Sequence, residues 1–230
     1  EVLNRIQNDY VDEPAIRDVV AGAIRGLLEN IDPHGGYLNP KDVAFYKDYD
    51  LLKSPGIGVV LSKRFGYPVI VSAIPGGPAA KANLTTGDMI ESIDGTTTRE
   101  MNLIQIRNLL ANPAGKPVAL SVIRRQRAEP EAITLDRTTI QAPPVEAKML
   151  EGNIAYLKVP FLGPGKALEA RSQLDVLLKK GAGSVILDLR STAGGDEKEG
   201  VLLANLLIDS GTIGYVQGQK LEKRIFQANP

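Results

Sequence analysis

Hydrophobic residues recur at helical spacing near the start of the chain. Apolar residues at positions 16, 19, 20, 23, 24, 27 and 28 form one stripe, and Pro14 suits the first turn of a helix. The pattern predicts an amphipathic helix with one buried stripe, which ends where Pro33 and the glycines at 35 and 36 follow. A second short helix is expected over residues 40–52, so residues 1–52 are predicted to form a helical arm.

The pattern changes from Gly56 onward to short runs of residues that favour β-strands. Turn residues separate these runs, and two helical stretches interrupt them at residues 77–82 and 101–111. Five or so strands and two helices in so short a region predict a small, partly open β-barrel over residues 53–138. The strands are expected at residues 57–61, 69–74, 89–93, 118–123 and 133–135.

A third region begins after the linker Gln141-Ala142-Pro143-Pro144 and alternates strands with helices. Its nearly continuous apolar run at 184–189 is typical of a strand buried on both faces, as in a parallel β-α-β unit. Residues 139–230 are therefore expected to hold the start of an α/β domain, and the whole chain an α+β fold. Strands are expected at 154–159, 184–189 and 213–216, and helices at 167–180 and 197–207.

Composition makes several functions improbable. Twenty-seven basic residues balance 27 acidic ones among 230, so no net charge attracts the chain to nucleic acid or to an anionic membrane. With no cysteine and one histidine, His34, we expect no metal site and no cofactor. No apolar stretch approaches the length of a transmembrane segment. No serine is flanked by the glycines of a nucleophile elbow, so a complete catalytic triad is not expected among these residues.

Three motifs in order resemble a bacterial-type PDZ domain: Pro55-Gly56-Ile57-Gly58-Val59, Ile74-Pro75-Gly76-Gly77-Pro78-Ala79-Ala80 and residues 86–95. Residues 32–38 before them, and residues 187–190 with Gly194-Gly195 after them, extend the likeness to the carboxyl-terminal processing, or tail-specific, proteases. The resemblance implies a serine endopeptidase that cuts proteins near their C-terminal tails in a periplasmic or other extracytoplasmic setting. In that family the serine nucleophile and lysine base follow later, so this chain is expected to be an inactive amino-terminal portion.

The PDZ resemblance implies a peptide-binding site for protein or peptide C-termini. The backbone amides of Ile57, Gly58 and Val59 would hold the terminal carboxylate, and the glycines Gly56 and Gly58 would allow the close approach of a ligand. The alternative is that these glycines only shape a turn and that the apolar side chains belong to the core. The predicted lining of the pocket is Ile57 and Val59 with Leu103, Ile106 and Leu110 from the facing helix.

The loop 190–196 follows a predicted parallel strand and leads into a helix, a place where backbone amides can stabilise a negative oxygen. By resemblance to the proteases, Gly194 and Gly195 are the candidates for an oxyanion hole; the alternative is an ordinary glycine turn. Asp188 is interpreted as an ion-pair or hydrogen-bond partner of Arg190 rather than as a catalytic acid.

Two functional hypotheses follow. The first is a carboxyl-terminal processing serine protease whose PDZ domain binds the free carboxylate of its substrate. The alternative is a non-catalytic PDZ peptide-binding or scaffold protein in which the protease-like region serves as a partner surface. Self-association into a homo-oligomer is left open by both.

Overall fold

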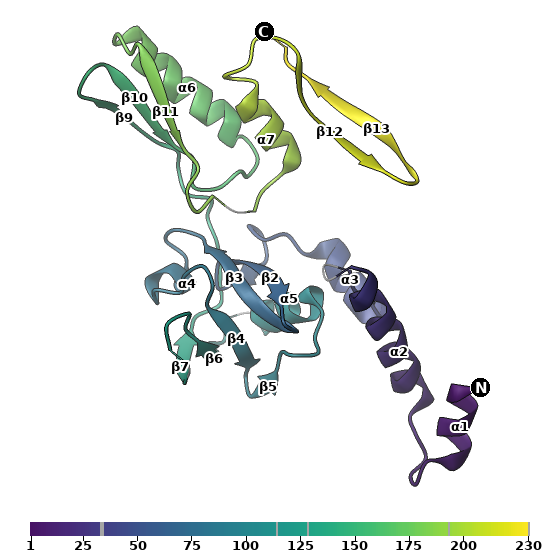
Figure 1. Cartoon of the computed structure of the whole chain (residues 1–230). Coiled ribbons are helices and arrows are strands. Elements are labelled where there is room, and N and C mark those ends of the chain that lie inside the picture. The colour runs from purple at the N-terminus through teal and green to yellow at the C-terminus, as the bar shows by residue number, and fades with distance from the viewer. Residues whose placement is uncertain (33–34, 114, 128, 193, 230) are drawn as a thin grey trace. The chain divides into compact units, whose positions relative to one another are not determined.

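The computed structural model describes residues 1–32, 35–113, 115–127, 129–192 and 194–229 (Figure 1). The chain divides into two compact units. The first contains Glu1–Ile57, Leu61–Ile70 and Gly87–Thr139, and the second contains Gly58–Val60, Val71–Thr86 and Ile140–Pro230. The mixed helix and strand content confirms the predicted α+β fold.

The predicted helical arm contains α1 (Val2–Asp9), α2 (Ile16–Ile31) and α3 (Pro40–Asp48). Helix α3 begins as its sequence requires, because the Asn39 side chain accepts hydrogen bonds from the amides of Lys41 and Asp42 while Pro40 stands in the first turn. The stripe of α2 is less buried than predicted, since its apolar residues are half-buried or exposed and Leu27 is 67% exposed. The expectation of a buried stripe was therefore wrong.

The strands of the predicted barrel region form one sheet in the order β2-β3-β4-β6-β7, with β5 beside β4. Alternate residues of β6 point into the core, where Val118, Leu120 and Val122 are buried, as a period of two requires. The strands are β2 (Val59–Arg64), β3 (Tyr67–Ala73), β4 (Met89–Ile93), β5 (Thr96–Thr97), β6 (Val118–Ile123) and β7 (Pro130–Leu135).

Two helices accompany this sheet, α4 (Pro78–Lys81) and α5 (Leu103–Ala111), close to the predicted ranges. Helix α5 opens with a capping box, in which the Asn102 side chain accepts from the amide of Gln105 and the Gln105 side chain accepts from the amide of Asn102. It packs against α3 and against the short strand β1 (Pro55–Gly56), which pairs with β8 (Thr138–Thr139).

In the second unit, β10 (Ile154–Lys158) lies between β9 (Glu146–Leu150), which is antiparallel to it, and β11 (Ser184–Asp188), which is parallel. Helix α6 (Lys166–Lys179) packs on β9 and β10, and its residues Ala167 and Ala170 join the core around Leu157. The parallel pair was predicted, but burial on both faces was not correct. Strand β11 is an edge strand in this sheet, and Ile186 is 45% exposed.

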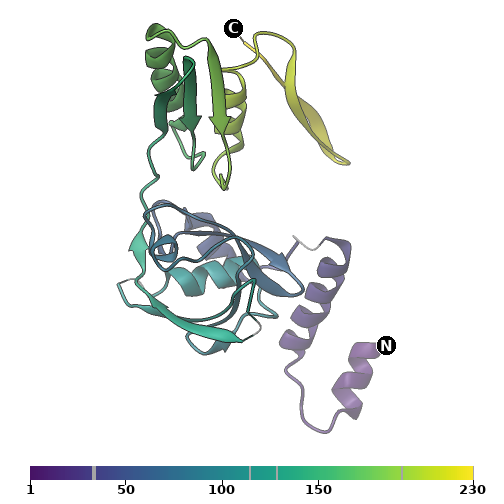
Figure 2. The same ribbon diagram turned by 60° about the vertical axis from the view of Figure 1, so that its left-hand side comes forward.

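Helix α7 (Glu197–Ala204) supplies the cap that α6 lacks. Residue Gly165 stands at the N-cap of α6 and has no side chain to offer, so the buried carboxylate of Glu199 accepts from the amides of Gly165 and Ala167 at 2.8 Å each. Strands β12 (Thr212–Gly218) and β13 (Leu221–Gln227) follow as an antiparallel hairpin, visible as the long yellow ribbon in Figure 2.

Candidate functional site

The predicted carboxylate-binding loop lies between two strands. Ile57 and Gly58 separate β1 from β2, and the side chains of Ile57 and Val59 are buried at 1% and 7% exposure. Gly58 has a φ of +76°, and a Cβ added there would lie 3.1 Å from Cδ1 of Ile140. Both observations explain why the loop uses glycine at this position, since an L side chain is strained there and has little room.

The backbone donors of this loop decide whether it can hold an anion. The carbonyl of Gly58 accepts a hydrogen bond from the amide of Ile74 at 2.8 Å, which fixes the peptide plane after Gly58. Within the described part of the chain, the amide nitrogens of Ile57 and Gly58 donate to no other backbone group. These two adjacent N–H groups can therefore donate hydrogen bonds to an anionic ligand.

The helix residues predicted for the pocket fall into two environments. Ile106 is fully buried and Leu110 nearly so, whereas Leu103 is half-buried. Helix α5 packs beside β1, the strand that leads into Ile57. The role of Leu103, Ile106 and Leu110 in binding a ligand stays a prediction.

A cavity of about 300 Å³ lies at the first turns of α5. Leu103 and Arg107, one helical turn apart, line it together with Lys63 of β2 and residues of the arm. Sequence reasoning missed Lys63 and Arg107. The four-residue step from Leu103 to Arg107 predicts that both lie on one face of α5, and the alternation along β2 places Lys63 on the face of Val59. Nothing in the sequence, however, indicated that Lys63 and Arg107 line the same cavity.

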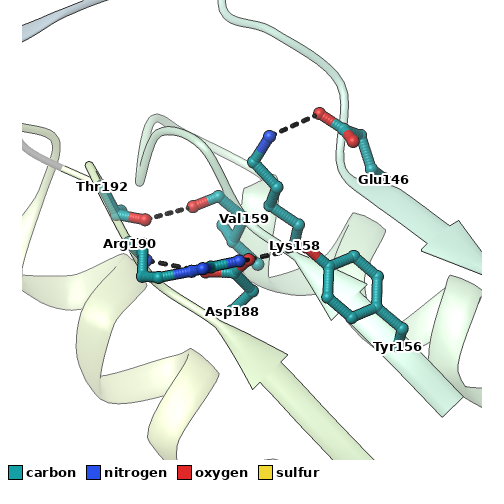
Figure 3. Close-up of polar contacts among 7 residues, drawn as sticks. All are labelled: Glu146, Tyr156, Lys158, Val159, Asp188, Arg190 and Thr192. Atoms are coloured by element: carbon teal, nitrogen blue, oxygen red, sulfur yellow. Dashed lines mark hydrogen bonds and ion pairs between the residues drawn. The ribbon is translucent and has the colours of Figure 1, made fainter.

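In the second unit, Asp188 ends β11 and gathers donors around its carboxylate (Figure 3). It accepts from the amide and the guanidinium of Arg190, at 2.7–3.0 Å, and from the hydroxyl of Tyr156 at 2.6 Å. The predicted pairing of Asp188 with Arg190 is confirmed. Sequence reasoning missed Tyr156, which is placed by the register of β10 on β11.

The donors from Arg190 and Tyr156 change the ionisation of the Asp188 carboxyl group. The Arg190 guanidinium, followed by the Tyr156 hydroxyl, holds the pKa of Asp188 well below its usual range, while the hydrogen bond to Asp188 raises the pKa of Tyr156. Asp188 thus stays an anion and an acceptor near neutral pH. This arrangement favours a structural role for it over one in general acid catalysis.

The chain after Asp188 is held by further hydrogen bonds. The Thr192 side chain donates to the carbonyl of Val159 (Figure 3). The Thr192 amide donates to the carbonyl of Leu189. Ser191 adopts a φ of +62°, and its carbonyl accepts from the buried Ser72 hydroxyl at 2.9 Å. These contacts fix the backbone from Leu189 to Thr192.

The two glycines predicted for the oxyanion hole both have positive φ, +77° at Gly194 and +118° at Gly195. Residue Gly195 forms a parallel bridge with Leu162, and a Cβ added to it would overlap the Leu162 carbonyl oxygen. The next amide, that of Asp196, donates to this same oxygen at 2.9 Å, and Asp196 caps α7. Among the described residues, the amides of Gly194 and Gly195 donate no hydrogen bond to another backbone group, so they can serve an anionic oxygen.

A nucleophile with its base is not found in the described part of the chain. No described serine is hydrogen-bonded to a lysine or histidine side chain, and Ser121 donates instead to Glu91. His34 and Ala193 lie outside the described residues. In the described ranges no three His, Cys, Asp or Glu residues gather as metal ligands, and no helix is long and apolar enough to cross a membrane.

Comparisons with known proteins agree with these two regions. Residues 69–124 match the PDZ domain, and residues 153–230 match peptidase family S41. The carboxy-terminal processing protease CtpA of Bacillus subtilis is 29% identical over 225 residues, which cover 96% of this chain and 48% of that protein. Carboxyl-terminal-processing peptidase 2, chloroplastic, of Arabidopsis thaliana is 28% identical over 213 residues, covering 84% and 40%.

The fold matches a solved structure, that of a photosystem II D1 C-terminal processing protease. The match has a TM-score of 0.79 at 22% identity and covers 99% of this chain and 68% of that one. The chain spans about half the length of the curated relatives it matches. The predicted resemblance to carboxyl-terminal processing proteases with a PDZ domain is confirmed.

We expect Asp188→Asn to lower the melting temperature at pH 7, with a smaller effect in acid. Because the folded-state pKa lies below the unfolded value of about 3.9, the stabilisation by the carboxylate is present above about pH 4 and is lost progressively below it. Thermal denaturation of both proteins between pH 7 and pH 2 measures this, with Asp209→Asn as an exposed control. If the difference in melting temperature between the wild type and Asp188→Asn does not become smaller in acid, the stabilising role of the Asp188 carboxylate is contradicted.

Gly195→Ala should destabilise the second unit by about 2–4 kcal/mol, because the new methyl group meets the Leu162 carbonyl and the backbone conformation is strained. Gly183→Ala is the matched control, since a Cβ there meets no atom within 4 Å and its φ is not positive. Urea denaturation followed by circular dichroism compares the two. Equal stabilities would show that the bridge to Leu162 is not rigid.

Proposed function

We propose that this chain is the substrate-recognising part of a carboxyl-terminal processing serine protease, and that its PDZ domain binds the free carboxylate of a protein or peptide C-terminus. The observation that carries the proposal is the pair of amides at Ile57 and Gly58, which donate to no described backbone group and lie directly before β2, the edge strand of its sheet. Hydrogen bonds from backbone N–H groups to a carboxylate are charge-assisted and favour the charged terminus over a neutral one.

The bound peptide extends along β2 as an added strand in this proposal. Main-chain hydrogen bonds to β2 supply affinity that does not depend on sequence, and the apolar side chains around the loop select a small apolar terminal residue. Gly56, Ile57, Gly58 and Val59 are the proposed carboxylate-binding residues. Leu103, Ile106 and Leu110 complete the proposed peptide-binding set.

Gly194 and Gly195 are the proposed oxyanion donors. In acyl transfer, a serine oxygen adds to the scissile carbonyl, and the oxygen of the tetrahedral intermediate takes the negative charge that backbone amides stabilise. The unpaired amides of both glycines support this assignment. The serine and its lysine base are proposed to lie outside these 230 residues, as the resemblance implies.

Three further features are proposed with this function. The chain is divided into a helical arm at 1–52, a PDZ domain at 53–138 and part of a protease domain at 139–230. Its partners are polypeptide C-termini, and nucleic acid is not among them, in line with the balanced charge. An extracytoplasmic location follows the family resemblance.

A labelled peptide that ends in two alanines should bind the chain at least tenfold more tightly with a free carboxylate than with an amidated terminus, because the amide loses charge-assisted hydrogen bonds. Fluorescence anisotropy measures both affinities. Gly58→Ala should weaken binding of the free acid, whereas Gly22→Ala, on an open face of α2, should not. Equal affinities for the acid and the amide would refute the carboxylate site.

The purified 230-residue chain should release no product from a fluorogenic peptide above the buffer rate, since no described serine is hydrogen-bonded to a lysine or histidine side chain and Ser72 and Ser121 donate to other groups. Trypsin serves as the positive control for the assay. Sustained turnover that survives exhaustive purification would locate a nucleophile within these residues.

The non-catalytic binder is distinguished by the coding sequence beyond Pro230. A continuation with a Gly-Ser-Ala-type segment and a later lysine supports the protease. A stop codon close to Pro230 supports the binder, and the peptide-binding result holds for either.

A further inference from the structure

Helix α5, one wall of the proposed peptide site, is attached to its neighbours at both ends. At its start, the Asn102 side-chain amide donates to the carbonyl of Tyr37 at 3.0 Å, and the Gln105 side-chain amide donates to the carboxylate of Asp42 at 2.9 Å. Each of these capping side chains therefore uses its oxygen for the helix and its nitrogen for the arm. The first turn of α5 is thus joined to the arm.

The last turn of α5 is held by Arg137, whose side chain is only 1% exposed. Its guanidinium donates to the carbonyl of Leu109 at 2.9 Å. Carbonyls in the last turn of a helix have no partner within the helix, and a cation beside them also interacts favourably with the helix dipole. Arg137 therefore satisfies an acceptor that α5 leaves open, at the residue before Leu110 of the proposed pocket.

The same guanidinium reaches two further segments. It donates to the carbonyls of Lys116 and Pro117 at 3.0 and 2.7 Å, in the loop between α5 and β6. It also donates to the carboxylate of Asp94 at 2.7 Å, in the turn between β4 and β5. The four bonds match the four N–H groups of its two terminal nitrogens. One side chain therefore joins the end of α5 to this loop and this turn.

The fifth N–H group of Arg137, at Nε, is buried without a hydrogen-bond partner. In the described part of the chain, no other buried side-chain nitrogen or oxygen lacks a partner. An unpaired buried donor destabilises the fold, and a lysine at this position would have no such group. However, the three N–H groups of a lysine could not serve four acceptors. The position therefore uses the fork of an arginine to hold several acceptors at fixed distances.

The backbone of Arg137 leads into the segment that supports the carboxylate-binding loop. The next two residues form β8, which pairs with β1 so that Thr138 lies opposite Gly56. Ile140 follows, and its Cδ1 atom lies 3.1 Å from the position of a Cβ added at Gly58. Strand β1 also packs against α5. This segment thus contacts the loop, and the side chain of its first residue is bonded to the facing helix.

We propose that Arg137 is a positioning residue of the peptide-binding site. It fixes the gap between the carboxylate-binding loop and α5, and it thereby restricts the terminal side chain of the bound tail to a small one. The proposal rests on the proposed function, because this gap matters only where the end of a peptide occupies it. A buried side chain with four hydrogen bonds in a close-packed interior resists widening of the gap. A gap of fixed width rejects a larger side chain, whereas a loosened one adapts to it.

The test uses the 230-residue chain and two labelled octapeptides with a free carboxylate, identical except for a terminal alanine or leucine. The ratio of their association constants, measured by fluorescence anisotropy, defines the size preference. Arg137→Lys should shift this ratio about threefold to tenfold toward leucine, because the ammonium keeps the charge beside Asp94 but cannot bond all four acceptors. Asp94→Asn, at an exposed turn, should shift the ratio in the same direction by a smaller factor.

A matched control separates positioning from stability. Val122→Ala removes buried atoms from β6, outside the four contacts of Arg137. It should lower the melting temperature, measured by circular dichroism, and leave the size preference unchanged. If Arg137→Lys does not fold, Asp94→Asn decides the test, and an unchanged ratio in that variant overturns the proposal.

The outcomes separate this inference from the proposed function. An unchanged size preference in folded Arg137→Lys overturns the positioning role, even when amidation of the peptide weakens binding. A shift toward leucine supports the role even when the acid and the amide bind equally, in which case only the carboxylate site fails. A shift of equal size in Val122→Ala overturns the role, and the absence of binding by either peptide overturns both proposals.

Discussion

The candidate sites depend on main-chain amides at two glycine loops that donate to no other backbone group in the described part of the chain. At Gly58 and at Gly195 the backbone passes so close to its neighbours that a Cβ has little or no room, and both residues have positive φ. Other backbone contacts hold each loop in place. The Gly58 carbonyl accepts a hydrogen bond from the Ile74 amide, and Gly195 forms a bridge with Leu162. The amides are thereby left available, and such pre-positioned donors need little reorganisation when an anion arrives.

The loops, the helix that begins at Leu103 and the parallel pair β10-β11 were all predictable because each depends on local signals. Gly56-Ile57-Gly58-Val59 marks its loop by composition, Asn112 marks the end of α5, and the apolar run at 184–189 marks β11. Strand β9 and strand β13 were missed. In β13 the polar run from Glu222 to Arg224 hides the alternation that would identify a strand. Strand β9 does alternate polar and apolar residues from Glu146 to Met149, but the run is short, and pairing with β10 is what defines it.

The contacts between the arm and α5 and the partners of Asp188 were beyond sequence reasoning for a related reason. Tyr37 and Asn102 are 65 residues apart, and Tyr156 and Asp188 are 32 apart, so only the fold brings them together. The burial of β11 was overestimated. A continuous apolar run shows that a strand is suited to burial on both faces, but it does not show whether neighbouring elements cover both faces in this sheet. Apolar pattern predicted the elements well, and the contacts between polar side chains had to come from the structure.

The shared use of Asn102 and Gln105 has a consequence for how the chain can be dissected. The change from a helical to a β-rich sequence pattern suggests a domain boundary near residue 53. However, the side-chain amides of Asn102 and Gln105 donate across this boundary to Tyr37 and Asp42. A fragment cut at that boundary would leave these two donors to water and would uncover the start of α5. The arm and α5 belong to the same compact unit, so a fragment that keeps both hydrogen bonds begins upstream of Tyr37.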